Sequence, residues 1–153
     1  MLTCTKTFDE IPFAHRQPKH DGHCAFIHGH NWKVTVEFLA TSLDHNGFVV
    51  DFGKLHFVKE YLAKFDHALV LSANDPLWDS MTLERGQETF WIDPLGTRVA
   101  RVVQVGNGSC EGLAEMFATD INELIERETS GRVTVARLTV HEDEDNSATY
   151  YAD

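Results

Sequence analysis

The chain has few cysteines, and their spacing is not that of a structural framework. The 153 residues include three cysteines, Cys4, Cys24 and Cys110, without a Cys-x-x-Cys pair. This odd and irregularly spaced set excludes a disulfide framework and indicates free thiols in a reducing compartment. A chain of this length is most simply one domain, and it buries about 68–70% of its unfolded surface without needing disulfides. We therefore take residues 1–153 as one domain.

Long apolar runs and basic residues are scarce as well. No run approaches the roughly 20 residues of a membrane span, and the N-terminus MLTCTKTFDE lacks the regions of a signal peptide. We therefore expect a cytoplasmic protein with no membrane contact. The 13 Lys and Arg residues against 24 Asp and Glu residues give a net charge of −11. This charge disfavours nucleic acid as a partner and favours a small molecule.

The segment HCAFIHGH, from His23 to His30, precedes the most regular alternation in the chain. Apolar and polar residues alternate from Trp32 to Phe38, which predicts a half-buried strand over about residues 31–40. His28 and His30 share the parity of the apolar face, so both imidazoles point inward if the strand reaches back to them. Gly29 between them allows another backbone or a ligand to come close.

A metal site is one interpretation of these histidines, and hydrogen-bonded histidines without a ligand are the other. His15, in Phe13-Ala14-His15, offers a third imidazole. Three neutral imidazoles with an open fourth position are typical of catalytic zinc, because structural sites are closed by four protein ligands. Cys24 is then either the fourth ligand or a reactive thiol near the metal.

Hydrophobic spacing and capping residues predict the other elements. Ser109 or Asn107 is expected to cap the second helix, where Glu111 in the first turn suits the helix dipole. The segment 72–105 is expected to be a partly irregular excursion that ends in a strand, and Arg98 and Arg101 are weak candidates for binding an anion. The expected strands are Leu2–Phe8, Val99–Val105, Val133–Glu142 and Ser147–Tyr151, and the expected helices are Phe52–Lys64, capped by Asp51, and Cys110–Arg127.

Asp66 and His67 follow the first expected helix. Adjacent acidic and imidazole residues are more often a surface pair, but the apolar run Ala68–Leu71 carries this pair next to the core. A carboxylate beside an imidazole orients the ring and raises its pKa, which prepares a histidine for proton transfer near neutral pH.

Glu142 continues the apolar face of the expected strand Val133–Glu142. Burial of a carboxylate is unfavourable unless it is paired, so Glu142 either faces a partner or lies in water beyond the end of the strand. A carboxylate forms a bidentate, charge-assisted pair with adjacent N–H donors, such as those of a pterin or a guanine.

Together, and in this order, the motifs resemble the 6-pyruvoyltetrahydropterin synthase superfamily. The branch that the chain most resembles is 6-carboxy-5,6,7,8-tetrahydropterin synthase of the queuosine pathway, which also has three residues between the cysteine and the HGH motif. The matching segments are Phe13-Ala14-His15, Cys24-x-x-x-His28-Gly29-His30-Asn31, Gly47–Phe52, Asp66-His67, and Glu142 followed eight residues later by Tyr150.

The resemblance implies an α+β tunnelling fold. In this fold two helices pack on one face of a four-stranded antiparallel sheet, and subunits join edge to edge into a barrel. It implies a homohexamer of two stacked trimers with active sites at subunit interfaces. The implied roles are Zn²⁺ binding by His15, His28 and His30, proton transfer by Cys24, Asp66 and His67, and substrate binding by Glu142, Glu111 and Ser109.

The implied activity is that of a zinc-dependent lyase. It would convert 7,8-dihydroneopterin triphosphate to 6-carboxytetrahydropterin, acetaldehyde and triphosphate. Two alternatives stay open: a 6-pyruvoyl product, as in tetrahydrobiopterin synthesis, and a non-catalytic zinc or pterin-binding module in which Cys24 closes the metal site. A metal-dependent hydrolase is weaker, because no activating carboxylate adjoins the histidines.

Overall fold

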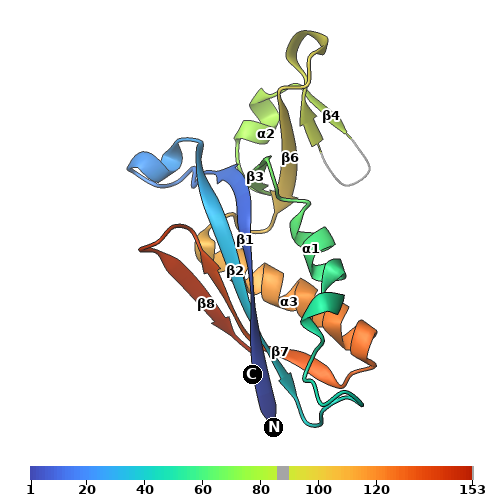
Figure 1. Cartoon of the computed structure of the whole chain (residues 1–153). Coiled ribbons are helices and arrows are strands. Elements are labelled where there is room, and N and C mark those ends of the chain that lie inside the picture. The colour runs from blue at the N-terminus through green and yellow to red at the C-terminus, as the bar shows by residue number, and fades with distance from the viewer. Residues whose placement is uncertain (86–89, 153) are drawn as a thin grey trace.

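The computed structural model describes residues 1–85 and 90–152, and its central feature is an eight-stranded sheet with strand order β4-β5-β6-β3-β1-β2-β7-β8 (Figure 1). The strands are β1 (Leu2–His15), β2 (His28–Ala40), β3 (Ala68–Ser72), β4 (Leu83–Arg85), β5 (Phe90–Ile92), β6 (Ala100–Val105), β7 (Val133–His141) and β8 (Ser147–Tyr151). The helices are α1 (His56–Leu62), α2 (Leu77–Ser80) and α3 (Cys110–Thr129), and 3₁₀ turns span His23–Ala25, Phe52–Lys54 and Pro94–Gly96.

The expected four-stranded antiparallel sheet forms only half of this sheet. Strands β1, β2, β7 and β8 pair antiparallel in that order, whereas β3 pairs parallel with both β1 and β6. The expectation is thus confirmed for these four strands and wrong in strand number, because parallel pairing through β3 extends the sheet to eight strands. All five residues of Ala68–Ser72 are buried, and a short run that is buried on both faces shows no alternation from which a strand could be predicted.

Segment 72–105, expected to be partly irregular, carries α2, β4, β5 and β6. Figure 1 shows it beyond the end of β7 and β8, at the end of the molecule opposite both termini. Leu69, Leu71 and Val102 form a small hydrophobic cluster there, separate from the main core. Leu77, Trp78 and other apolar side chains of the segment pack against this cluster.

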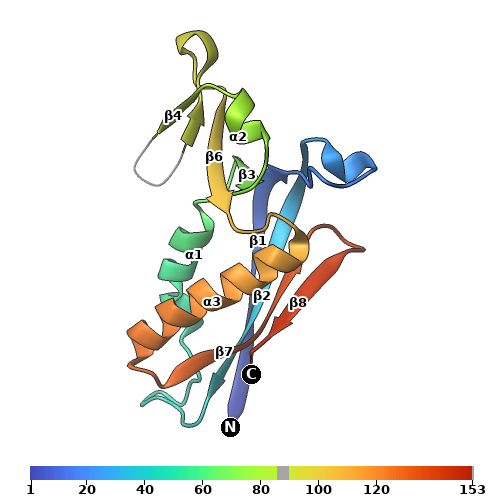
Figure 2. The same cartoon turned by 180° about the vertical axis from the view of Figure 1, so that it is seen from behind.

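Helices α1 and α3 and the strands β1, β2 and β7 share the main hydrophobic core. Figure 2 shows both helices on the same side of the sheet. The fully buried Trp32 and Phe38 come from β2, and Phe117 comes from α3. Tyr61 of α1 donates a hydrogen bond to Asp120 of α3, which ties the two helices together.

The second expected helix is confirmed, and the first is shorter than expected. Ser109 caps α3 by accepting a hydrogen bond of 3.1 Å from the Gly112 N–H. The predicted helix 52–64 is instead a 3₁₀ turn followed by α1, because Leu55 departs from helical geometry at φ −89° and ψ 27° between them. Asp51 does cap this region, since its carboxylate accepts from the Gly53 N–H at 2.9 Å.

A β-bulge in β1 decides which residues of that strand face the core. Phe8 pairs with Val34 and Ile11 pairs with Trp32, so two residues of β1 lie opposite one of β2. The extra residue reverses the parity of the strand beyond it. As a result Phe8, Ile11 and His15 are all buried.

The helices of the described residues do not include a membrane-spanning one. Among residues 1–85 and 90–152, no helix combines the length and the apolar composition that a membrane crossing needs.

Candidate metal centre and active site

Three histidines from two neighbouring strands converge at one end of the main sheet. His15 ends β1 and lies opposite His28, the first residue of β2, while His30 lies opposite Phe13. The ring centroid of His15 is 4.7 Å from that of His28 and 5.5 Å from that of His30, and the rings of His28 and His30 are 5.1 Å apart. Strand β2 therefore reaches back far enough to turn both of its histidines inward.

Trp32 forms a rigid wall behind this histidine cluster. Its indole is fully buried, stacks on Phe13 at 4.4 Å and donates to the Phe13 carbonyl at 3.0 Å. The rings of His15 and His30 stand edge-on to it at 4.9 and 5.4 Å. Packing against the indole thus limits how the two imidazoles can turn.

Backbone carbonyls fix the tautomers of two of the imidazoles. Nδ1 of His15 donates to the Gly108 carbonyl at 2.8 Å, and Nδ1 of His28 donates to the Phe26 carbonyl at 2.7 Å. Each neutral ring then carries its lone pair on Nε2. Burial lowers the pKa of His15, with the charges of His28 and His30 acting in the same direction against the Gly108 hydrogen bond and Glu142. The neutral form of His15 is therefore favoured.

Glu142 joins the three histidines from the turn after β7. Its Oε1 lies 3.1 Å from Nε2 of His15 and 3.0 Å from Nε2 of His30. One ligand atom from each of the four residues lies within 4.8 Å of the other three. The strand ends at His141, one residue earlier than expected, yet Glu142 is half-buried and paired instead of lying in water.

The donor set fits a zinc ion. Nε2 of His15 lies 3.1 Å from a carboxylate oxygen, and in the neutral ring both atoms are acceptors, so the contact is favourable with either a proton on Nε2 or a cation between them. Nε2 of His30 is also buried, and despite its 3.0 Å contact with Glu142 it makes no aligned hydrogen bond to the described residues. Imidazole nitrogens and a carboxylate oxygen are ordinary zinc ligands, and coordination would satisfy all of these atoms.

A cavity of about 520 Å³ adjoins the histidine cluster, and five of the residues singled out from the sequence line it. They are His15, Cys24, Ser109, Glu111 and Glu142. Gln17, His20, Cys110 and Asn146 also line it. The N-terminus of α3 and the loop between β1 and β2 thus supply side chains to one pocket beside the candidate metal ligands.

Cys24 lies in the 3₁₀ turn His23–Ala25 of that loop. The Gln17 N–H donates to the Cys24 carbonyl at 2.7 Å, which holds the loop closed. Within the described residues, the tight group of potential ligands comprises the three histidines and Glu142, without Cys24. The geometry therefore favours a thiol beside the metal ligands over a thiol that closes the metal site.

Cys110 is a cavity residue that the sequence did not single out. Burial raises its pKa to about 11, with Glu142 adding to the shift, and its Sγ lies 3.4 Å from the Val140 carbonyl. It is therefore a protonated thiol at neutral pH. Its position directly after the predicted cap Ser109 was the signal that could have indicated it.

The pair Asp66–His67 does not line this cavity. Nδ1 of His67 lies 2.8 Å from the Asp66 carboxylate, and the His67 side chain is 82% exposed. Asp66 instead lines a separate cavity of about 360 Å³ beside the β1 bulge. The structure of one chain thus forms the expected carboxylate–imidazole pair but does not bring it to Cys24.

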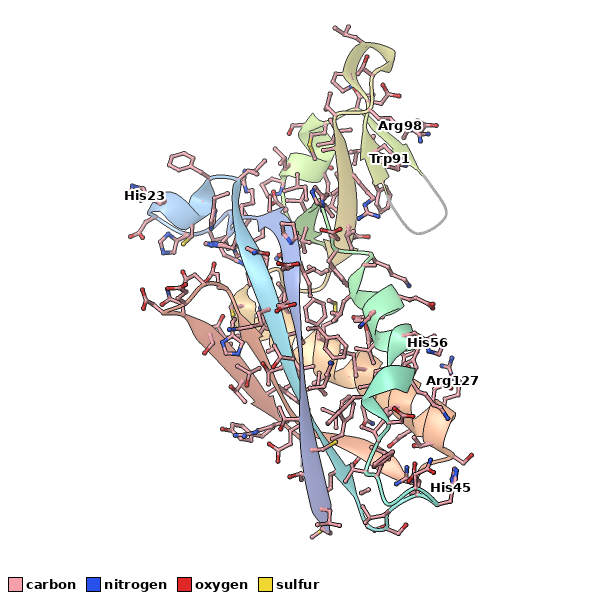
Figure 3. All side chains as sticks on the ribbon, in the orientation of Figure 1. His23, His45, His56, Trp91, Arg98 and Arg127 are labelled. Carbon is pink, nitrogen blue, oxygen red and sulfur yellow. The ribbon has the colours of Figure 1, made fainter. Side chains whose placement is uncertain are left out.

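Arg98 and Arg101 make contacts away from the histidine cluster. The Arg98 side chain is paired with Glu84 at 3.2 Å and lies over the Trp91 ring at 4.7 Å. Figure 3 shows Arg98 and Trp91 in the same part of the molecule. Arg101 donates to the backbone carbonyls of Asp66 and, at 3.4 Å, of Ala63. Arg101 therefore holds the backbone of the acid–imidazole pair, and neither arginine lines the cavity of Cys24.

Comparisons with known proteins agree with the motifs. A family model described as 6-pyruvoyl tetrahydropterin synthase matches residues 3–153. A protein of Rickettsia typhi named 6-carboxy-5,6,7,8-tetrahydropterin synthase is 35% identical over 77 residues, which are 49% of this chain and 55% of the relative. The chain thus spans about half the length of the first curated relatives that it matches.

Solved structures share the fold. An uncharacterized protein from Wolinella succinogenes superposes with a TM-score of 0.78 at 21% identity, covering 99% of this chain and 98% of that one. The 6-pyruvoyl tetrahydropterin synthase of Plasmodium vivax superposes with a TM-score of 0.65 at 17% identity, covering 100% and 99% of the two chains.

Proposed function

Because the chain belongs to the 6-pyruvoyl tetrahydropterin synthase family, we propose that it is a zinc-dependent 6-carboxy-5,6,7,8-tetrahydropterin synthase. Its reaction would convert 7,8-dihydroneopterin triphosphate to 6-carboxytetrahydropterin, acetaldehyde and triphosphate. The observation that carries the proposal is the group of His15, His28, His30 and Glu142, of which His15 and Glu142 line a cavity that also holds Cys24. The names of the curated relatives support the carboxy branch of the family.

The metal would be held by Nε2 of His15 and of His28, since carbonyls already occupy Nδ1 of both rings. His30 would contribute its own Nε2, which faces Glu142. A bound zinc ion supplies Lewis acidity that makes a substrate hydroxyl more acidic. Glu142 would then turn its carboxylate to the N–H donors of the pterin ring, where two charge-assisted hydrogen bonds are available. Ser109 and Glu111, at the N-terminus of α3, line the same cavity and would contact the substrate.

Cys24, in its thiolate form, would act as a base within the cavity and accept a proton from the substrate. Asp66 would orient His67 for the complementary proton transfer through their 2.8 Å contact. The exposed His67 of one chain and the Cys24 cavity of another would meet where two subunits join. This arrangement would explain why one chain alone does not assemble all three residues in one cavity.

The sheet has free edges that support such an assembly. β8 is the last strand of the sheet, and β3 pairs with β1 only at Ala14 and His15. The outer edge of β1 before Ala14 therefore carries no strand in the described part of the chain. Unpaired edges can add a strand from another chain, and we propose that β1 and β8 of neighbouring subunits join into a barrel and form a hexamer.

Incubation of the zinc-loaded protein with 7,8-dihydroneopterin triphosphate tests the proposal. We expect mass spectrometry to detect 6-carboxytetrahydropterin, and a hydrazine reagent to trap acetaldehyde during turnover. A 6-pyruvoyl pterin without aldehyde would instead assign the chain to tetrahydrobiopterin synthesis. Zinc and pterin binding without any turnover would favour a non-catalytic module.

A further inference from the structure

Ser72, at the start of segment 72–105, is linked to the histidine cluster through Gly108. Ser72 is the last residue of β3 and is only 5% exposed. Its Oγ accepts a hydrogen bond of 2.9 Å from the backbone N–H of Gly108, which lies between β6 and α3. Both partners are buried, so this hydrogen bond has little competition from water.

The same glycine holds His15. The Gly108 carbonyl accepts the Nδ1 proton of His15 at 2.8 Å, across 93 residues of sequence. Only the two soft backbone dihedrals of Gly108 separate its N–H from its carbonyl. A hydroxyl that fixes the N–H therefore also limits where the carbonyl points, and with it the orientation of the imidazole.

From this chain of contacts we propose that Ser72 is a positioning residue for the metal site. Its hydroxyl fixes the backbone of Gly108, whose carbonyl keeps the proton of His15 on Nδ1 and presents Nε2 toward His28, His30 and Glu142. The inference rests on the proposed zinc-dependent function and assigns a part in it to segment 72–105. Groups that hydrogen-bond a metal-binding imidazole directly, as the Gly108 carbonyl does, commonly change metal affinity by about 10- to 100-fold when they are removed.

Further contacts keep Ser72 itself in place. Its carbonyl accepts from the Trp78 indole N–H at 2.8 Å and from the Asp75 N–H at 3.0 Å. The Asp75 carboxylate is fully buried and lies 3.2 Å from Nε of Arg16, the residue that follows His15. The chain just after Ser72 is thus tied to the residue that follows His15.

There is little room for Gly108 to move. A Cβ atom added to Gly108 would lie 3.3 Å from Oγ of Ser72, a tight contact. Gly108→Ala therefore keeps every hydrogen-bonding group and displaces the hydroxyl, whereas Ser72→Ala removes the hydroxyl and leaves the space. These two substitutions disturb the same contact by different means.

Zinc affinity of the full chain, measured by competition with a chromophoric chelator, tests the inference. Ser72→Ala and Gly108→Ala should each weaken zinc binding by about 10-fold, the lower end of the range for groups that bond a metal-binding imidazole directly, because both leave the Gly108 carbonyl in place. Ser72→Thr, which keeps the hydroxyl, should retain the parent affinity. The control is Ser80→Ala, because the Ser80 hydroxyl bonds the Leu77 carbonyl in an exposed turn of the same segment. With Co²⁺ in place of zinc, the visible bands should shift in Ser72→Ala and not in Ser80→Ala.

The outcomes separate this inference from the proposed function. Equal zinc affinity and an unchanged Co²⁺ spectrum in Ser72→Ala and the parent overturn the role of Ser72 and leave the proposed enzyme standing. A lower zinc affinity of Ser72→Ala with an unchanged Co²⁺ spectrum also overturns this role. The same holds if Ser72→Thr loses as much zinc affinity as Ser72→Ala, because a general loss of structure would explain either result. A parent chain that binds no zinc overturns both.

Discussion

His15 and His28 lie directly opposite each other on the antiparallel strands β1 and β2, with ring centroids 4.7 Å apart. Opposite residues of such a pair have Cβ atoms only about 4.5–5.5 Å apart. The backbone pairing therefore brings the two imidazoles together before any metal binds. Because the pairing runs along most of both strands, removal of one imidazole should leave the fold intact.

Alanine at His28 or His30 should strip zinc from the protein. Each substitution removes one of the three proposed zinc ligands. Glu142, the fourth member of the group, is proposed to bind substrate and would not replace the lost ligand. Metal analysis by mass spectrometry should find about one zinc per subunit in the parent and little in either variant. The control is His45→Ala, on the loop at the opposite end of the molecule in Figure 3. Undiminished zinc in both histidine variants would make the site assignment wrong.

Cys24→Ala should keep the fold and zinc and lose turnover, because Cys24 is proposed to transfer a proton and not to bind the metal. Product formation and zinc content, measured on the same sample, separate these two roles. Cys4→Ala, on β1 away from the cavity, is the matched control and should keep both. Loss of zinc from Cys24→Ala, with no activity in the parent, would favour the binding module.

Glu142→Gln should weaken pterin binding by about 1.5–3 kcal/mol, the range for hydrogen bonds to a charged group. Isothermal calorimetry of the zinc-loaded protein measures this change. Glu144→Gln, in the exposed turn beside it, should bind pterin as the parent does. Zinc content of the Glu142 variant adds a second readout, since loss of zinc at unchanged pterin affinity would make Glu142 a metal ligand instead.

Stability should fall at high pH through Tyr61. Burial, together with the hydrogen bond and charge of Asp120, raises the pKa of Tyr61 above its ordinary value near 10. The protonated Tyr61 therefore contributes to the free energy of unfolding. This contribution is fully present below the pKa of Tyr61 in the unfolded chain. It is lost as the pH rises from there toward the higher pKa of the folded chain, by up to about 1.4 kcal/mol per pH unit.

Urea denaturation between pH 9 and pH 11 at one protein concentration checks this prediction. Tyr61→Phe should make the decline less steep, and Tyr151→Phe, at an exposed position on β8, should keep the slope of the parent. A slope that is the same in all three proteins would exclude Tyr61 as the source.

The local patterns in the sequence were enough to predict much of the main sheet and the long helix. Period-two alternation predicted β2 and its inward histidines, and capping at Ser109 predicted the start of α3, because both signals depend on near neighbours. The motifs were also enough to indicate the family. None of these inferences required a contact between distant segments.

Only the tertiary structure decided how distant segments meet. The β1 bulge that turns His15 inward depends on its pairing with β2, and β3 lies in an apolar run without a period. The strand expected at Val99–Val105 is confirmed as β6, but only the structure shows its parallel pairing with β3. Glu142 meets His15 across 127 residues of sequence, and Gly108 meets it across 93. Local propensity carries no information about such contacts, because they arise when the whole core packs. The sequence therefore determined which residues are suited to the chemistry, and packing decided which of them lie together.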